Sequence, residues 1–320
     1  MLVSRGDAER APTPCVLTIG NFDGIHLGHQ ALLRLLTDKA RALGLPAVVL
    51  TFEPHPREYF APRQAPARLA SLRDKLLRLA AAGVDNTRII RFNQRFAALS
   101  AEQFIERVLV RSLRVRHLII GDDFRFGAGR AGDFAMLQAA GEAHGFVVEA
   151  MSTHAQGGER VSSSAVRDAL AAGDLDRAAR LLGRPYSMAG LVMHGDKIGR
   201  TLGFPTANIQ LKGRRPPLSG VYNVLVEGLA PHPVPGVASV GVRPTVNDAG
   251  RPTLEVHLLD WDADCYGAHL RINFLHKQRD EAKYPSLEAL RAQIALDVDH
   301  ARSWFADHAG LTIDTQDNHG

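Results

Sequence analysis

Short apolar runs alternate with stretches of helical periodicity through the first half of this 320-residue chain. The apolar runs predict buried strands at Val16–Gly20, Pro46–Phe52, Thr87–Phe92, Val115–Gly121 and Gly145–Met151. Helices are predicted at His29–Leu43, at Ser71–Ala82, from an N-cap at Ser100 and behind an N-cap at Asp133. Repeated strand–helix units indicate an α/β fold, a parallel sheet with helices on both faces. Ligands of such sheets bind beyond the carboxyl ends of the strands.

The second half has a different texture. After two short helical segments, Ser163–Ala171 and Asp174–Leu182, the sequence Gly183-Arg184-Pro185 breaks the pattern. Short apolar runs punctuated by Gly and Pro then predict strands at Gly190–His194, Ala207–Leu211, Val221–Glu227, Gly236–Gly241, Thr253–Asp260 and Leu270–Leu275. They favour a small antiparallel barrel or sandwich, on which an amphipathic helix over Ser286–Phe305 packs. We therefore expect a first domain over residues 1–184, a second over 185–308 and a polar tail over 309–320.

Composition limits the class of protein. No run approaches the roughly 18–20 apolar residues of a membrane span, and Met1–Pro14 lacks the apolar stretch of a secretory signal. We predict a cytoplasmic protein without a membrane partner, a monomer or weak homo-oligomer. Cys15 and Cys265 lack metal or disulfide spacing and are expected to be free thiols. The net charge is +4, but the basic residues are scattered among acidic ones, which disfavours nucleic acid as a partner.

The most informative stretch lies between the first predicted strand and the first helix. It reads Gly20-Asn21-Phe22-Asp23-Gly24-Ile25-His26-Leu27-Gly28-His29. Its glycines let the backbone approach a ligand, and the free N–H groups at a helix start suit a phosphate. His26 and His29 are three residues apart, so both can face one anion and stabilise its charge. The alternatives are a metal site completed by His55 and simple packing at the helix start; the absence of GxGxxG disfavours a dehydrogenase.

Two later stretches narrow the choice. Gly121-Asp122-Asp123-Phe124-Arg125-Phe126-Gly127 follows the fourth strand, and its aromatic rings could flank a planar ligand or pack the loop. Val161-Ser162-Ser163-Ser164-Ala165-Val166-Arg167 opens a helix with three hydroxyls and a cation, which suits a phosphate, although serines there are also ordinary caps.

In this order and spacing, the three stretches resemble the adenylyltransferase module of bacterial FAD synthetases over nearly all of residues 14–184. The resemblance implies a Rossmann-like nucleotidyltransferase domain in which the FMN phosphate attacks the α-phosphorus of ATP and releases pyrophosphate. It implies catalytic roles for His26 and His29 and flavin contacts for Asp123, Phe124, Arg125 and Phe126. It implies ATP contacts for Gly20, Asn21, Phe22, Asp23, Gly24, Gly28, Ser163, Ser164 and Arg167. Ser164 replaces the expected Thr and keeps its hydroxyl.

The second half carries its own glycine-rich motif, Gly195-Asp196-Lys197-Ile198-Gly199-Arg200-Thr201-Leu202-Gly203-Phe204-Pro205-Thr206-Ala207-Asn208. The Thr206 hydroxyl and the Asn208 carbonyl are hard oxygen ligands, two residues apart on one strand face, and suit Mg²⁺. The alternative is a hairpin loop built of turn residues.

This motif resembles the signature of riboflavin kinases, with further matches through Asp280–Tyr284, over about residues 184–305. The resemblance implies a small Greek-key β-barrel with a C-terminal helix. It makes Glu255 the base that takes the proton of the riboflavin 5′-hydroxyl, with Mg²⁺ on Thr206 and Asn208. It implies ATP contacts for Gly195, Lys197, Gly199, Arg200 and Gly203, and a flavin contact for Arg243. From the alternation of Thr253–Leu258 alone, Glu255 could equally be a residue on the exposed face of a strand.

Together the two resemblances predict a bifunctional enzyme whose substrates are small molecules: riboflavin plus ATP gives FMN, and FMN plus ATP gives FAD, with Mg²⁺ at both sites. One alternative is another adenylyl- or cytidylyltransferase with a non-catalytic barrel. A second is a regulatory protein that binds flavin or nucleic acid.

Overall fold

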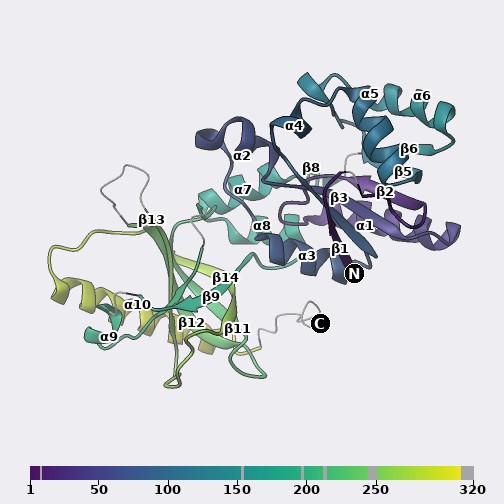
Figure 1. Ribbon diagram of the computed structural model, residues 1–320. Coiled ribbons are helices and arrows are strands. Elements are labelled where there is room, and N and C mark those ends of the chain that lie inside the picture. The colour runs from purple at the N-terminus through teal and green to yellow at the C-terminus, as the bar shows by residue number, and fades with distance from the viewer. Residues whose placement is uncertain (8, 153–154, 196–197, 212–214, 244–250, 311–320) are drawn as a thin grey trace. The chain divides into compact units, whose positions relative to one another are not determined.

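The computed structural model describes residues 1–7, 9–152, 155–195, 198–211, 215–243 and 251–310. The chain forms two compact units (Figure 1). Among the described residues, the first unit consists of Met1–Pro66 and Leu72–Ser162, and the second of Ala67–Ser71 and residues from Ser163 to 310.

The first unit is built on a parallel six-stranded sheet in the order β1-β4-β3-β2-β5-β6. Its strands are β1 (Leu2–Arg5), β2 (Cys15–Ile19), β3 (Ala47–Glu53), β4 (Asn86–Arg91), β5 (Val115–Gly121) and β6 (Val147–Met151). A short hairpin follows, β7 (Ala155–Gln156) and β8 (Glu159–Arg160). The helices are α1 (Leu27–Leu43), α2 (Pro56–Phe60), α3 (Leu72–Ala81), α4 (Gln94–Ala97), α5 (Ala101–Phe104), a π-helix (Ile105–Ser112) and α6 (Phe134–His144). The predicted α/β fold is confirmed, and Ser100 and Asp133 cap their helices as expected.

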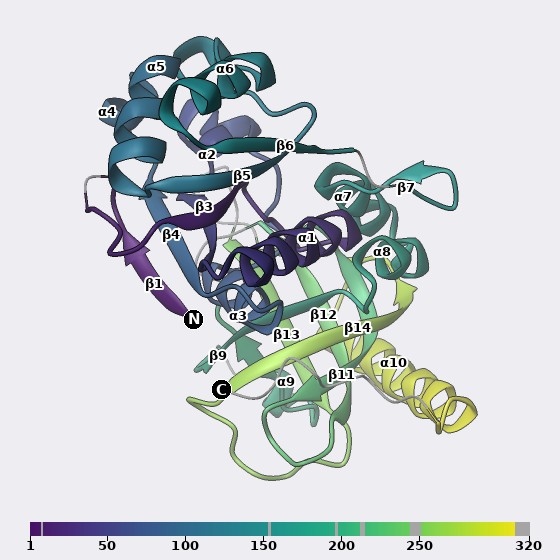
Figure 2. The same ribbon diagram turned by 90° about the vertical axis from the view of Figure 1, so that its right-hand side faces the viewer.

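Side chains alternate across this sheet and fill a core on each face. On β2, Leu17 and Ile19 join the core that the π-helix and α6 cover, whereas Val16 joins the core under α1 and α3. Both views show the two groups of helices on opposite sides of the sheet (Figures 1 and 2). The carboxyl ends of the strands therefore form an edge at which loops can bind a ligand.

β1 was not predicted from the sequence. It pairs in parallel with β4 at the edge of the sheet, over only four residues. Leu2 and Val3 are both exposed, so β1 carries no alternation of buried and exposed side chains.

The second unit is a closed six-stranded barrel in the order β10-β13-β12-β11-β14-β9. Its strands are β9 (Ser187–Met193), β10 (Ala207–Ile209), β11 (Gly220–Glu227), β12 (Val234–Arg243), β13 (Arg251–Leu258) and β14 (His269–Arg279). β11, β12 and β13 follow one another as hairpins and β14 returns to pair with β11, which is the Greek-key order. The predicted barrel, rather than a sandwich, is confirmed.

Four helices accompany the barrel: α7 (Ser163–Ala172), α8 (Leu175–Leu182), α9 (Ile198–Thr201) and α10 (Leu287–Asp307). α7 and α8 group with the barrel by their contacts, and Lys277 of β14 lies against the turn at Gly173 between them. The predicted boundary at residue 184 assigns these helices to the first domain instead, and that boundary remains a prediction.

Helix α10 is fixed to the barrel by apolar packing and by an ion pair between the buried Asp297 and the half-buried Arg279. Val298 and Ala301 pack against Val221 and Val237. The guanidinium of Arg279 donates to both carboxylate oxygens of Asp297, at 2.9 and 2.6 Å.

Burial separates the two cysteines. Both are free thiols, as predicted. Cys15 is buried in the sheet, and burial raises its pKa to about 12, so this thiol is unreactive in the folded protein. Within the described ranges, the helices are too short or too polar to cross a bilayer.

We expect Asp297→Ala to lower the stability of the second unit by about 2 kcal/mol, because it removes two charge-assisted hydrogen bonds from the half-buried Arg279 guanidinium. Both tryptophans, Trp261 and Trp304, lie in this unit, so urea unfolding followed by tryptophan fluorescence reports on it alone. Asp260→Ala is the matched control: Asp260 also receives two bonds from an α10 arginine, Arg302, but this pair is exposed. Its loss should leave the midpoint nearly unchanged. Equal shifts in the two variants would contradict the role given to burial.

Candidate functional site

The loop between β2 and α1 is strained. Phe22, Gly24 and Ile25 all have positive φ, at 48°, 81° and 42°. This region is ordinary for glycine but uncommon for Phe and especially for a β-branched residue. Phe22 and Ile25 are buried, so packing holds them in place. Strain of this kind, about 1–3 kcal/mol per residue, is typical of functional sites.

Within this loop the two predicted histidines lie together. The rings of His26 and His29 stack at 3.7 Å, and the backbone N–H of His29 donates to His26 Nδ1 at 3.3 Å. His26 therefore caps α1 through Nδ1. For this atom, the alternative of a structural role at the helix start is correct. Because Nδ1 accepts a hydrogen bond, the proton of the neutral ring is on Nε2. Gly28 lies beside this ring: a methyl group there would stand 3.2 Å from Nδ1.

Two polar atoms of the loop are left for a ligand. His29 Nδ1 and Asn21 Oδ1 are buried without a hydrogen-bond partner among the described residues. Burial lowers the pKa of His29 well below 6.5, and nearby His26 and Lys75 lower it further. The ring is therefore neutral near pH 7. Orphaned buried polar atoms are rare, and at the carboxyl edge of a parallel sheet they indicate a binding site.

The metal alternative gains no support. His55 caps α2, its Nδ1 accepting from the backbone of Arg57 at 3.0 Å. Across the described ranges, no group of three His, Cys, Asp or Glu side chains could hold an ion.

The loop after β5 divides its residues between packing and exposure. Phe126 is 6% exposed and belongs to the sheet core, with Gly132 against its ring. Phe124 stacks on it at 5.8 Å and stays half-buried. Asp123 pairs with Arg160 at 2.7 Å, and Arg125 with Asp133 at 3.2 Å. The flavin contacts assigned to these residues remain predictions, and the burial of Phe126 favours the loop-packing alternative for that ring.

An aromatic cluster that the sequence reasoning missed lies at the same edge. Its rings contact one another at 5.1–5.9 Å. The members are Phe52, Tyr59, Phe60, Phe92 and Phe96. Phe60 is 67% exposed, so the cluster presents an aromatic surface. The sequence did contain a signal for this cluster. Phe52 and Phe92 each end a predicted strand, and the carboxyl ends of parallel strands meet at one edge of the sheet.

Ser163, Ser164 and Arg167 lie on α7, within the second unit by contacts. Arg167 Nε donates to the carbonyl of Ala67 at 2.6 Å. These three residues are predicted to bind the same ATP phosphates as His26 and His29, and this remains a prediction.

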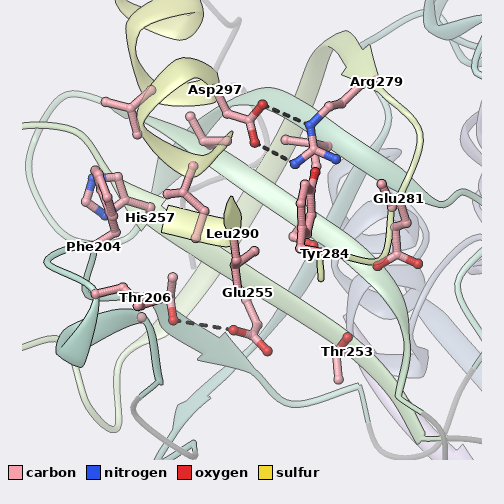
Figure 3. A pocket seen from close by; sticks show the side chains of 18 of the residues that line it. Phe204, Thr206, Thr253, Glu255, His257, Arg279, Glu281, Tyr284, Leu290 and Asp297 are labelled. Carbon is pink, nitrogen blue, oxygen red and sulfur yellow. Dashed lines mark hydrogen bonds and ion pairs between the residues drawn. The ribbon is translucent and has the colours of Figure 1, made fainter. Parts of the chain in front are cut away.

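The second unit has a cavity of about 310 Å³ between the barrel and α10 (Figure 3). Apolar side chains of Val221, Val237, Leu290, Ile294 and Val298 line it. Its polar lining residues are Thr206, Ser239, Thr253, Glu255, His257, Arg279, Glu281, Tyr284 and Asp297. A hollow with apolar walls and placed polar groups is typical of a small-molecule site.

Strand β13 decides which side chains reach the cavity. Leu254, Val256 and Leu258 are buried on one face, whereas Glu255 and His257 line the cavity on the other. Glu255 is half-buried. From the alternation of β13 alone, Glu255 could have been a surface residue. In the structure the same alternation places it in the wall of a cavity.

Glu255 meets the glycine-rich motif at Thr206, whose hydroxyl donates to Glu255 Oε2 at 3.5 Å (Figure 3). Asn208 stands opposite Glu255 in the ladder between β10 and β13. Gly195 lies against the side-chain amide of Asn208, where a methyl group would collide with it. A hydroxyl, an amide carbonyl and a nearby carboxylate are the hard oxygen donors that Mg²⁺ takes, so the residues fit the predicted metal.

The structure does not describe every residue predicted for this site. Lys197 lies outside the described residues, as do the side chains of Arg200 and Arg243. Gly199 lies against the carbonyl of Phe204, and Gly203 follows α9.

Three cavity residues had no role in the sequence reasoning. Arg279 is held by Asp297 and lies 5.8 Å from the centre of the Tyr284 ring. Glu281 packs its carboxylate against the backbone of Gly241, and burial raises its pKa. For Glu281 and Tyr284 the signal was the segment Asp280–Tyr284, which matched the family pattern as a whole; Arg279 lies just before it.

Thr206 also lines a second hollow, of about 440 Å³. This hollow is walled by Trp261, Tyr266 and Cys265, with Asp262 and Asp264 at its edge. Thr206 therefore stands between two spaces, each large enough for part of a substrate.

The comparisons with known proteins agree with this two-site arrangement. The family model for FAD synthetase matches residues 8–165, and that for riboflavin kinase matches residues 182–305. Bifunctional riboflavin kinase/FMN adenylyltransferases from Escherichia coli (strain K12) and Pseudomonas fluorescens are each 53% identical, over 93% and 92% of this chain and 94% of their own lengths. A crystal structure described as a macrolide-efflux protein from Streptococcus pneumoniae has a TM-score of 0.81 at 30% identity, covering 95% of this chain and 100% of that one.

We expect the His29 ring to stay neutral as the pH falls from 8 through 6.5, because burial holds its pKa well below 6.5. An unfolded chain takes up the proton near pH 6.5, so His29 contributes stability above that pH and loses it below. NMR of the imidazole signals, with His29→Gln to assign the resonance and a histidine peptide in the same tube, measures this directly. A midpoint at or above 6.5 would contradict the burial argument.

Proposed function

Because the chain belongs to the family of bifunctional riboflavin kinase/FMN adenylyltransferases, we propose that its second unit phosphorylates riboflavin to FMN and its first unit converts FMN to FAD. The FAD synthetase and riboflavin kinase modules occur in the predicted order, and the chain is a bifunctional enzyme of flavin biosynthesis. Its assignment to ATP-dependent reactions follows from the same family.

In the kinase reaction, Glu255 is the general base. The supporting observation is its carboxylate in the cavity wall, 3.5 Å from the Thr206 hydroxyl. Glu255 accepts the proton of the riboflavin 5′-hydroxyl as that oxygen attacks the γ-phosphorus of ATP, and the bond to ADP breaks. Phosphoryl transfer depends mainly on alignment and charge neutralisation, which the convergence of these groups supplies.

Thr206 and Asn208 would hold the Mg²⁺ ion of this site through the hydroxyl and the amide carbonyl. The ion would supply positive charge beside the phosphates. Asn208 is kept in place by the ladder to Glu255 and by the close backbone of Gly195.

The two hollows beside Thr206 suit the two substrates. The apolar cavity under α10, with Tyr284 in its wall, fits the flavin ring. The hollow walled by Trp261 and Tyr266 fits the adenosine of ATP, since an aromatic surface suits a purine. Thr206 then lies where the hydroxyl of one substrate meets the phosphate of the other.

In the adenylyl transfer, the β2–α1 loop receives the phosphates of ATP. His26 and the neutral His29 lie there with stacked rings, and their N–H groups stabilise the negative charge that develops as the FMN phosphate attacks the α-phosphorus and pyrophosphate leaves. Asn21 Oδ1, buried without a partner among the described residues, gives the loop a further polar atom for the nucleotide. Bound phosphate would raise the pKa of His29 again, because it brings negative charge to the ring.

The aromatic cluster at the edge of the sheet supplies the flavin side of this reaction. Phe60, Phe92 and Tyr59 form a surface on which a planar ring can stack. The predicted cytoplasmic location, the predicted monomer or weak homo-oligomer and the predicted absence of a nucleic-acid partner are part of this proposal.

Single substitutions should separate the two reactions. Glu255→Gln is expected to slow FMN formation by about 10²–10⁴-fold, because it removes the base, and to leave adenylylation of supplied FMN intact. His29→Ala should reduce FAD formation by at least about 100-fold while FMN accumulates. The assay is incubation with riboflavin, ATP and Mg²⁺ followed by chromatography of the flavins. Loss of both activities from either change, in a protein that still folds, would contradict the two-site proposal.

Phe60→Ala should raise the KM for FMN in FAD formation by about 3–10-fold, the effect of one lost aromatic contact. Phe60→Tyr keeps the ring and is the matched control. Riboflavin phosphorylation in the same preparations serves as the internal standard. An unchanged KM for FMN would remove the aromatic cluster from the flavin site.

A further inference from the structure

We propose that His257 is a positioning residue of the kinase reaction: it holds the segment Phe204–Thr206 so that the Thr206 hydroxyl stays beside the Glu255 carboxylate. This inference rests on the function proposed for the cavity under α10. It assigns a task to a residue for which the sequence analysis gave no role.

The geometry begins with strand β13. His257 follows Glu255 by two residues, so both side chains leave the same face of the strand and line the same cavity (Figure 3). His257 Nδ1 lies 2.9 Å from the carbonyl oxygen of Pro205. A carbonyl only accepts, so Nδ1 carries a proton and donates. Of the two neutral tautomers, this bond requires the one protonated at Nδ1.

Pro205 gives this bond its importance. β10 spans only Ala207–Ile209, and its ladder with β13 comprises Ala207 opposite Val256 and Asn208 opposite Glu255. Thr206 stands just outside that ladder. Proline has no N–H, so its carbonyl is the backbone group by which residue 205 can be held. The His257 bond therefore extends the attachment of this chain segment to β13 by two residues beyond the ladder.

A second contact acts on the same segment. The Phe204 ring meets the His257 ring edge-on, with centroids 5.6 Å apart and planes at 84°. This is the favourable T-shaped arrangement. His257 thus holds residues 204 and 205 together, and Thr206 follows them directly with its hydroxyl donating to Glu255.

A purely structural role for His257 makes a different prediction from a positioning role. If the ring only fills space, replacements of similar size behave alike. If the hydrogen bond from Nδ1–H matters, the activity of a variant depends on whether its side chain places a donor where Nδ1 lies. The amide nitrogen of Asn is as many bonds from Cβ as Nδ1, whereas the amide nitrogen of Gln corresponds to Nε2. His257→Asn can keep the bond to Pro205, and His257→Gln cannot make it from the same place.

The experiment compares wild type, His257→Asn and His257→Gln in FMN formation, with FAD formation from supplied FMN as the internal control. We expect His257→Gln to lower kcat by about 10–100-fold, the range for residues that orient a ligand group, with a much smaller change in the KM for riboflavin. His257→Asn should recover most of the loss. His276→Gln is the matched control, because His276 is an exposed histidine of β14 that does not line the cavity. It should leave both activities unchanged.

Two further readouts do not depend on turnover. Calorimetry should show that His257→Gln weakens the binding of ADP in the presence of Mg²⁺ by about 10-fold and leaves binding without Mg²⁺ unaltered. Nitrogen-15 NMR of the wild-type protein, at a pH where the ring is neutral, should find the His257 proton on Nδ1.

The outcomes separate the two proposals. If wild type forms no FMN, the proposed kinase function fails, and the positioning role fails with it. If wild type forms FMN but His257→Gln is as active, or His257→Asn is as impaired as His257→Gln, only the positioning role is overturned. A proton found on Nε2 overturns it as well, even where the Gln variant does not fold.

Discussion

The cavity of the second unit depends on the ion pair between the half-buried Arg279 at the end of β14 and the buried Asp297 on α10. Asp297 is 4% exposed, and such a carboxylate is costly to bury unless its oxygens are paired. Arg279 meets both oxygens, and Gln293 donates to one of them at 2.9 Å. The pair fixes which face of α10 meets the barrel, and that face supplies a wall of the cavity. The same arginine lies over the Tyr284 ring, so one interaction orders both the helix and the segment that leads to it.

The barrel itself explains why the chemistry lies outside it. A closed barrel of six strands is narrower than the eight-stranded barrels whose interior just holds side chains, so no space for a ligand remains within. Leu254 and Val256 fill that interior from β13. Glu255 must therefore point outward, where water would surround it if nothing covered this face. Because α10 covers it, a carboxylate on an outer face becomes a group in the wall of a mostly apolar cavity.

Periodicity was sufficient to predict both sheets, since strands buried on both faces and amphipathic helices leave strong patterns. It could not predict β1, because Leu2 and Val3 are exposed and the strand is held by backbone pairing to β4. The glycine-rich motifs predicted where in the sequence each candidate site lies. The burial of single residues in these loops could not be predicted from the sequence. Phe124 and Phe126 occur in the same short stretch, but only Phe126 is buried in the core. His257 could not be found because its partner is a backbone carbonyl 52 residues away, which carries no sequence signal.

In the proposed reactions, the two sites stabilise negative charge on the transferred phosphorus group in different ways. In the first unit the loop keeps an unusual backbone at Phe22 and Ile25, and buries His29 so completely at Nδ1 that its ring is neutral. Such a site offers directed N–H donors rather than a fixed positive charge, and it binds most strongly when charge develops on the ligand. In the second unit a carboxylate must work beside phosphates that repel it. In the proposed reaction a cation held at Thr206 would offset that repulsion, so the position of the hydroxyl beside Glu255 is the feature on which the proposal depends.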